Sequence, residues 1–173
     1  ASAAEGDDVD IVLNRTPFYA EGGGQLADGG RITLSNGAVV EIEDVQSPVP
    51  GLSVHRGRVI SGSIEVGSDA LAEIDIQRRH AISRAHTATH MVHKAFREIL
   101  GETATQAGSE NSPGRFRFDF PSTGSVPVSV LNDVESRVNA LLLDNLEVTA
   151  ESMSQAKAKE LGVKINPRYG FWD

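Results

Sequence analysis

The chain has 173 residues, of which 39% are hydrophobic and only 5% aromatic, so its composition is that of a globular protein with an aliphatic core. It has no cysteine, which excludes disulfides, thiolate catalysis and zinc held by a cysteine of this chain. The net charge of −8 argues against a general nucleic-acid-binding surface, and no apolar run approaches the roughly 20 residues that cross a bilayer. The acidic start also lacks a signal-peptide pattern, so we expect a cytoplasmic protein with no membrane partner.

The first part of the chain reads as short strands separated by turns. Five segments alternate apolar and polar residues or are rich in β-branched residues, namely 9–13, 31–34, 38–45, 53–60 and 71–76. Glycine-containing pairs such as 29–30 and 36–37 supply turns between them. Many short strands at this spacing predict a small antiparallel β-barrel-like lobe over residues 1–77.

A glycine-rich segment lies inside this lobe. Residues 16–25 read Thr-Pro-Phe-Tyr-Ala-Glu-Gly-Gly-Gly-Gln and end with Gly22, Gly23, Gly24 and Gln25. Glycine permits positive φ angles and close approach of the backbone to a ligand, which makes these four residues candidates for substrate binding. A tight turn between strands is the simpler explanation of the glycines alone. The segment is not a nucleotide-binding motif, because no Gly-x-Gly-x-x-Gly or Gly-Lys-Ser/Thr follows.

The periodicity changes after residue 77. Apolar residues recur at helical spacing over 78–100, and Gly101 marks the end of that predicted helix. Strict alternation over 115–120 predicts a half-buried strand with Phe116, Phe118 and Phe120 facing inward. Further elements are expected at 130–145 (helix), 147–151 (strand) and 154–161 (helix). The fold class is therefore α+β, in which the lobe precedes a core over 78–173 with helices packed on an antiparallel sheet.

Two histidines one helical turn apart are the sharpest chemical feature. His86 and His90 fall on one narrow stripe of the predicted helix, with their Cβ atoms about 6 Å apart, so both imidazoles can reach one metal ion. His93 is a neighbour on this stripe but lies too far along the helix axis from His86 to share that ion easily. Surface histidines beside a helix core are the alternative. A zinc peptidase is disfavoured, because Thr87 stands where the general base of a His-Glu-x-x-His motif belongs.

Basic residues gather around the same helix. The window 78–117 holds seven basic and three acidic residues, so it carries +4 while the rest of the chain carries −12. Ordinary solvated surface charge explains this pattern on its own. Because the window coincides with the histidines, we identify four candidates for contacts with nucleic-acid phosphates, namely Arg78, Arg79, Arg84 and Lys94.

Four motifs together resemble the editing domain of alanyl-tRNA synthetases and its free-standing AlaX relatives. A threonyl-tRNA synthetase editing domain is a related member of this second additional domain family. The motifs occur in the family's order and spacing: Thr-Pro-Phe-Tyr-Ala-Glu-Gly-Gly-Gly-Gln at 16–25, His-Thr-Ala-Thr-His at 86–90, Gln-Ala-Gly-Ser at 106–109 and Arg-Phe-Asp-Phe at 117–120. The resemblance extends from about residue 9 to at least residue 161.

The resemblance implies hydrolysis of tRNA(Ala) wrongly charged with serine or glycine. It implies that His86 and His90 are zinc ligands and that Thr89 and Gln106 line the editing pocket as its catalytic residues, with the glycine-rich turn nearby. The implied partners are the acceptor end of tRNA(Ala) and the remainder of a parent, ATP-dependent synthetase. Proofreading is also physically required, since an alanine site cannot strongly reject a smaller residue or one that only adds a hydroxyl.

The chain departs from the family in one respect. The family's Cys-x-x-x-His motif, which supplies two further zinc ligands, is absent. We therefore expect a C-terminally truncated fragment with half a metal site, weak zinc affinity and impaired hydrolysis. Two other functions stay open at this point: a non-catalytic tRNA-binding or structural module of a synthetase, and an unrelated metal-dependent esterase.

Overall fold

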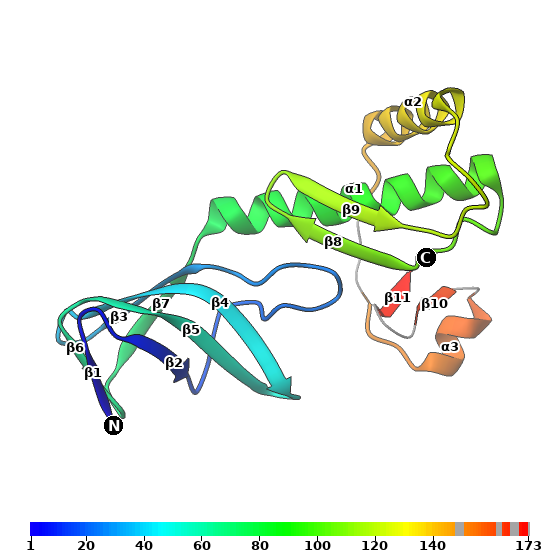
Figure 1. Ribbon diagram of the computed structural model, residues 1–173. Coiled ribbons are helices and arrows are strands. Elements are labelled where there is room, and N and C mark those ends of the chain that lie inside the picture. The colour runs from blue at the N-terminus through cyan, green and yellow to red at the C-terminus, as the bar shows by residue number, and fades with distance from the viewer. Residues whose placement is uncertain (148–150, 162–163, 167–169, 173) are drawn as a thin grey trace. The chain divides into compact units, whose positions relative to one another are not determined.

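The computed structural model describes residues 1–147, 151–161, 164–166 and 170–172 (Figure 1). The chain divides into two compact units, Ala1–Ser83 and Arg84–Asp173. Helix α1 (Ile76–Leu100) begins in the first unit and continues into the second. The predicted division at residue 77 falls at the start of this helix and stays a prediction. None of the helices in the described ranges is long and apolar enough to span a membrane.

The first unit is built on a five-stranded antiparallel sheet. Its spatial order is β2-β5-β4-β3-β7, so β2 and β7 are the edges, and within the described residues they do not pair with each other. The sheet is therefore open, without the full closure of a barrel. A two-stranded ribbon, β1 with β6, accompanies it. The strands are β1 (Ser2–Ala4), β2 (Asp8–Val12), β3 (Gly30–Leu34), β4 (Val39–Val49), β5 (Leu52–Ser61), β6 (Ser63–Glu65) and β7 (Ala70–Ile74).

Alternation of side chains explains the core of this sheet. Val40 and Ile42 of β4 are almost fully buried, while Glu41 between them is exposed. A register shift between Ile42 and Asp44 then moves the inward position to Val45, which is also fully buried. The bulge therefore explains why the period of two is broken in the middle of this long strand.

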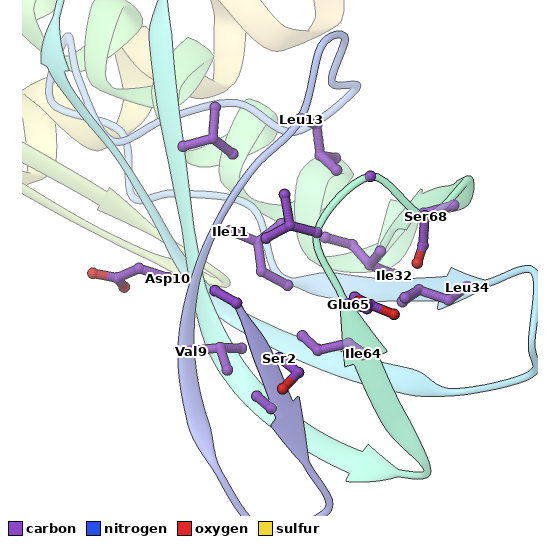
Figure 2. Close-up of a pocket in the computed structure, with 16 residues that line it drawn as sticks. Ser2, Val9, Asp10, Ile11, Leu13, Ile32, Leu34, Ile64, Glu65 and Ser68 are labelled. Atoms are coloured by element: carbon purple, nitrogen blue, oxygen red, sulfur yellow. The ribbon is translucent and has the colours of Figure 1, made fainter.

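One face of the first unit carries an open, apolar hollow of about 300 Å³ (Figure 2). Its lining comes from β1, β2, β3 and β6 and is mainly aliphatic, as in Val9, Ile11, Ile32 and Ile64. Polar residues, such as Asp10 and Glu65, also contribute to the lining. No residue of the four sequence motifs lines this hollow.

The second unit combines helices with a hairpin. Strands β8 (Gly108–Ser112) and β9 (Arg115–Asp119) pair in antiparallel register. Aromatic rings join the hairpin to α1, since the centroid of Phe96 lies 6.2 Å from Phe118 and 4.8 Å from Phe120. Val134 of α2 (Val128–Asp144) completes the same core. The remaining elements are α3 (Gln155–Glu160), β10 (Lys164–Asn166) and β11 (Gly170–Trp172). The predicted α+β class is confirmed.

Two details differ from the sequence-based expectation. Phe116 was expected to face inward with Phe118 and Phe120, but this prediction is wrong because its side chain is 36% exposed and stands outside the core cluster. The predicted strand over 147–151 lies mostly outside the described residues. Gly101, by contrast, has a φ of 87° after the last turn of α1, as expected for a residue that ends a helix.

Candidate functional site

The two histidines of α1 face each other in the second unit. Their Nε2 atoms are 3.2 Å apart, and the ring centroids are 4.8 Å apart with an interplanar angle of 44°. Both side chains are partly buried. The helix therefore brings the two imidazoles together as the spacing of four residues predicts.

Burial keeps these imidazoles neutral. It lowers the pKa of His86, and it lowers the pKa of His90 to about 4, with smaller contributions from the charges of His86 and His93. A neutral imidazole has a free nitrogen lone pair, which is the form that binds a metal ion. The pair is therefore in the correct protonation state at neutral pH.

The separation of the two nitrogens fits a zinc ion. Two ligand nitrogens, each about 2.0–2.1 Å from a tetrahedral zinc, lie about 3.3 Å apart, close to the 3.2 Å between the Nε2 atoms. Across the described ranges, however, no group of three or more His, Asp or Glu side chains could hold a metal ion. An N–H···N hydrogen bond between the rings also satisfies this distance. The residues present fit one edge of a zinc site.

Thr89 lies next to the pair in sequence and is held by the hairpin. Its side chain is 4% exposed, and its hydroxyl donates to the carboxamide oxygen of Asn111 at 2.6 Å. The backbone oxygen of Ala85, at 3.0 Å, is a second acceptor. Asn111 is fully buried in β8. No sequence pattern indicated it, because the contact joins residues 22 apart and Asn111 occupies a polar segment without a motif.

Gln106 is held by the same strand. Its side-chain amide donates to the Ser109 hydroxyl at 2.7 Å, and Ser109 is 8% exposed. His93 packs instead on Phe118, with ring centroids 5.3 Å apart. The second unit therefore combines the histidine pair with Thr89 and Gln106, and β8 supplies a hydrogen-bond partner to each of the latter two.

The glycine-rich segment belongs to the first unit and forms a tight turn. Gly22 and Gln25 exchange two backbone hydrogen bonds, of 3.2 Å and 2.9 Å. Gly23 and Gly24 between them have φ angles of 58° and 79°. Two consecutive positive φ angles define a type I′ turn, which residues with a Cβ adopt poorly. This explains why glycine occupies both central positions, as predicted from the motif.

Both ends of the loop that carries this turn are fastened to the first unit. At the start, the Thr16 hydroxyl lies 2.7 Å from Nε2 of the fully buried His55, whose Nδ1 lies 2.9 Å from the carbonyl oxygen of Ile11. At the end, Asp28 is 1% exposed and accepts from the Tyr19 backbone N–H at 2.8 Å.

Two arginines in the first turn of α1 form hydrogen bonds with the same end of the loop. Arg79 donates to Asp28 through Nε at 2.8 Å. Its Nη2 lies 2.7 Å from the same carboxylate oxygen, and its guanidinium lies 4.7 Å from the centre of the Tyr19 ring. Arg78 donates twice to the carbonyl oxygen of Ala27. Both guanidinium groups are thus engaged within the first unit, and their predicted contacts with phosphates stay predictions.

The other two basic candidates are on the surface of the second unit. Arg84 is exposed. The side chain of Lys94 is 61% exposed and lies 3.2 Å from Glu98, four residues further along α1. Neither residue is buried, so both side chains remain accessible to a ligand.

Comparison with known proteins gives relatives over nearly the whole chain. Residues 1–78 match the family model described as tRNA synthetases class II (A). An alanine-tRNA ligase from a Nocardioides species is 67% identical over 172 residues, which is 98% of this chain and 19% of that protein. The alanine-tRNA ligases of Acidothermus cellulolyticus and Streptomyces avermitilis are 63% and 54% identical, each over 98% of this chain and 19% of the relative.

The matched regions extend well beyond the family-model match and cover the segments that hold the histidine pair and the β8–β9 hairpin. The chain spans about a fifth of the length of the curated relatives that it matches. Its homologues are class II synthetases of the alanine-tRNA ligase family, and the chain corresponds to one segment of them.

Proposed function

We propose that this chain is the proofreading module of an alanine-tRNA ligase and that it hydrolyses the ester bond of tRNA(Ala) charged with serine or glycine. The observation that carries the proposal is the approach of His86 Nε2 to His90 Nε2, 3.2 Å, in the unit that also holds Thr89 and Gln106. The similarity to alanine-tRNA ligases supports the choice of tRNA. The working site would be the cytoplasm, where the rest of the synthetase charges the same tRNA.

The candidate residues have separate roles in this proposal. His86 and His90 offer neutral imidazole nitrogens to zinc, which when bound supplies Lewis-acid polarisation of an ester carbonyl. Thr89 and Gln106 offer a hydroxyl and an amide that orient the aminoacyl group. The accessible Arg84 and Lys94 side chains offer positive charge to the phosphates of the acceptor end.

A deacylation assay tests the proposal. We expect the chain to release serine from seryl-tRNA(Ala) slowly, as half a metal site implies, and in a zinc-dependent manner. His90→Ala or Gln106→Ala should slow the release by a further factor of at least about ten. His80→Ala is the matched control, because His80 is an exposed histidine of the same helix. An unchanged rate in both test variants, or equal hydrolysis of a seryl ester that lacks the tRNA, contradicts the proposal.

A non-catalytic module that binds tRNA or supports the synthetase is the second candidate. It is favoured by one observation, that the described residues offer a metal ion two histidines and no third ligand. Zinc content decides between the two. It is measured by elemental analysis after dialysis. Bound zinc that is lost in His86→Ala, together with deacylation by the wild-type chain, favours proofreading. A metal-free chain that binds tRNA without hydrolysing its ester favours the second candidate.

A further inference from the structure

Strand β8 presents two polar side chains on one face. Ser109 and Asn111 are two residues apart, so they point to the same side of the strand, while the side chain of Glu110 between them is 49% exposed. Ser109 is 8% exposed and Asn111 is fully buried. Burial of two polar groups side by side is costly unless each has a hydrogen-bond partner, so their positions call for a structural reason.

Their partners are the two residues assigned to the proposed pocket. The Ser109 hydroxyl accepts from the Gln106 amide at 2.7 Å, and the Asn111 carboxamide oxygen accepts from the Thr89 hydroxyl at 2.6 Å. Both distances are at the short end of the usual range for their donor types. One face of β8 thus binds Gln106, which precedes the strand, and Thr89, which lies on α1.

The bond from Thr89 to Asn111 determines what the threonine can offer a ligand. A hydroxyl has one proton and two lone pairs. With its proton directed at Asn111 and only 4% of the residue exposed to competing water, Thr89 can act only as an acceptor toward a third group. If Asn111 were apolar, the proton would turn to the carbonyl oxygen of Ala85, 3.0 Å away, as threonines in helices commonly do, and the two lone pairs would turn with it.

We propose that Asn111 and Ser109 are positioning residues, which orient the Thr89 hydroxyl and the Gln106 amide for substrate recognition. This inference rests on the proposed proofreading function. Asn111 sets the direction in which the Thr89 lone pairs point, so that they can accept from the side-chain hydroxyl of a seryl ester, which a glycyl ester lacks. Asn111 therefore contributes to hydrolysis of the seryl ester and is neutral toward the glycyl ester, whereas Ser109 acts on both esters through Gln106.

The test compares two esters in the full 173-residue chain. Asn111→Leu removes the acceptor at similar volume, Asn111→Asp keeps an acceptor oxygen, and Ser112→Ala is the control on the same strand, since Ser112 bonds only the Arg115 carbonyl oxygen among the described contacts. We expect Asn111→Leu to lower kcat/KM for seryl-tRNA(Ala) about tenfold and to leave glycyl-tRNA(Ala) within about twofold. Asn111→Asp restores the seryl rate, and Ser112→Ala changes neither.

Substitutions of Ser109 provide a second test. Ser109→Ala is expected to lower kcat for both esters with little change in KM, and Ser109→Thr, which keeps a hydroxyl, restores it. An equal loss for both esters in Asn111→Leu, or no loss in any variant, overturns the inference.

A spectroscopic readout separates failure of this inference from failure of the proposed function. In the wild-type chain the Thr89 hydroxyl proton is protected from solvent, so we expect its NMR signal to be visible. The signal should change its chemical shift in Asn111→Leu, where the proton turns to Ala85, and stay in place in Ser112→Ala. If the wild-type chain hydrolyses neither ester, the proposed function is wrong, and the orientation of Thr89 by Asn111 is judged by this signal. Absence of the signal in the wild-type chain contradicts that orientation.

Discussion

Gly57 of β5 occupies a point where the backbone of β4 comes too close for any side chain. A Cβ at this position would collide with the carbonyl oxygen of Glu41 and press on the side chain of Ile42. Because the obstacle is backbone within a paired sheet, it cannot move aside without disturbing the ladder. Glycine is therefore required here because there is no space for a Cβ atom, and not because of its φ angle.

Gly57→Ala is expected to lower the free energy of unfolding by about 1–3 kcal/mol, the usual cost of overpacking. Urea denaturation measures the change. Gly124→Ala is the control, because a Cβ there meets nothing within 4 Å, and its effect should stay within about 0.5 kcal/mol. Equal stability of the two variants would contradict the close approach of β4.

A second residue-scale effect concerns the carboxylate of Glu98. The hydrogen bond from Arg137, at 2.6 Å, is the largest cause that lowers the pKa of Glu98 from its ordinary value of 4.5 to about 2, and Lys94 adds to it. The pKa is lower in the folded chain than in the unfolded chain. The interaction therefore stabilises the fold fully above pH 4.5, and its contribution is lost as the pH falls toward 2.

We expect an NMR titration to find Glu98 ionised down to about pH 2. Arg137→Met should return its pKa toward 4.5, because the hydrogen bond and the positive charge are both removed. A wild-type titration near 4.5 would show that this pair, whose side chains are 34% and 39% exposed, is not formed in solution.

At the scale of elements, the glycine-rich loop depends on the first turn of α1. Asp28 is 1% exposed and its partner Arg79 is 19% exposed, whereas the ion pair between Arg58 and Asp8 in the same unit is 58% and 75% exposed. Removal of one partner from a buried pair leaves an uncompensated charge, which is far more costly than the loss of a solvated pair.

Asp28→Asn is therefore expected to lower the free energy of unfolding by about 3 kcal/mol, and Asp8→Asn by less than about 1 kcal/mol. Hydrogen exchange adds local detail, because the Tyr19 amide donates to Asp28 and should lose protection in the first variant only. Similar effects of the two substitutions would mean that Asp28 does not fasten the loop.

The elements differ in how far the sequence predicts them. Strand β5 and helix α1 have strong local periodicity, and both were predicted close to their observed bounds. Strand β4 was predicted over 38–45 and extends further, to Val49. Strand β8 was missed because it reads Gly-Ser-Glu-Asn-Ser, which has no apolar alternation, and it is a strand only through its pairing with β9. Tertiary context decides such segments.

The same distinction applies to the candidate site. The approach of His86 and His90 follows from helix geometry and was predicted, as were the positive φ angles of the glycine-rich turn. The contacts of Arg79 with Asp28, and of Thr89 with Asn111, join residues 51 and 22 apart in sequence. No local pattern encodes such contacts, so the sequence did not indicate that Arg79 also binds Asp28.

At the scale of the whole molecule, each unit has a hydrophobic core of its own. Ile32 belongs to the core of the first unit, and Phe96 to that of the second. We expect Ile32→Ala and Phe96→Ala to cost about 2–5 and 3–5 kcal/mol respectively. Native-state hydrogen exchange should show the loss of protection mainly in the unit that carries the substitution. Uniform loss across both units would show that they unfold as one.

The two fastened ends of the glycine-rich loop have a consequence for how this protein can change. Thr16 with His55, and Asp28 with Arg79, hold the ends of the loop independently of what lies between them. Extra residues inserted at the Gly22–Gln25 turn would lengthen only the tip of the loop, and doubling the length of a flexible loop costs only about 0.6 kcal/mol. Evolution or an engineer can therefore alter the reach of the tip without rebuilding the sheet beneath it.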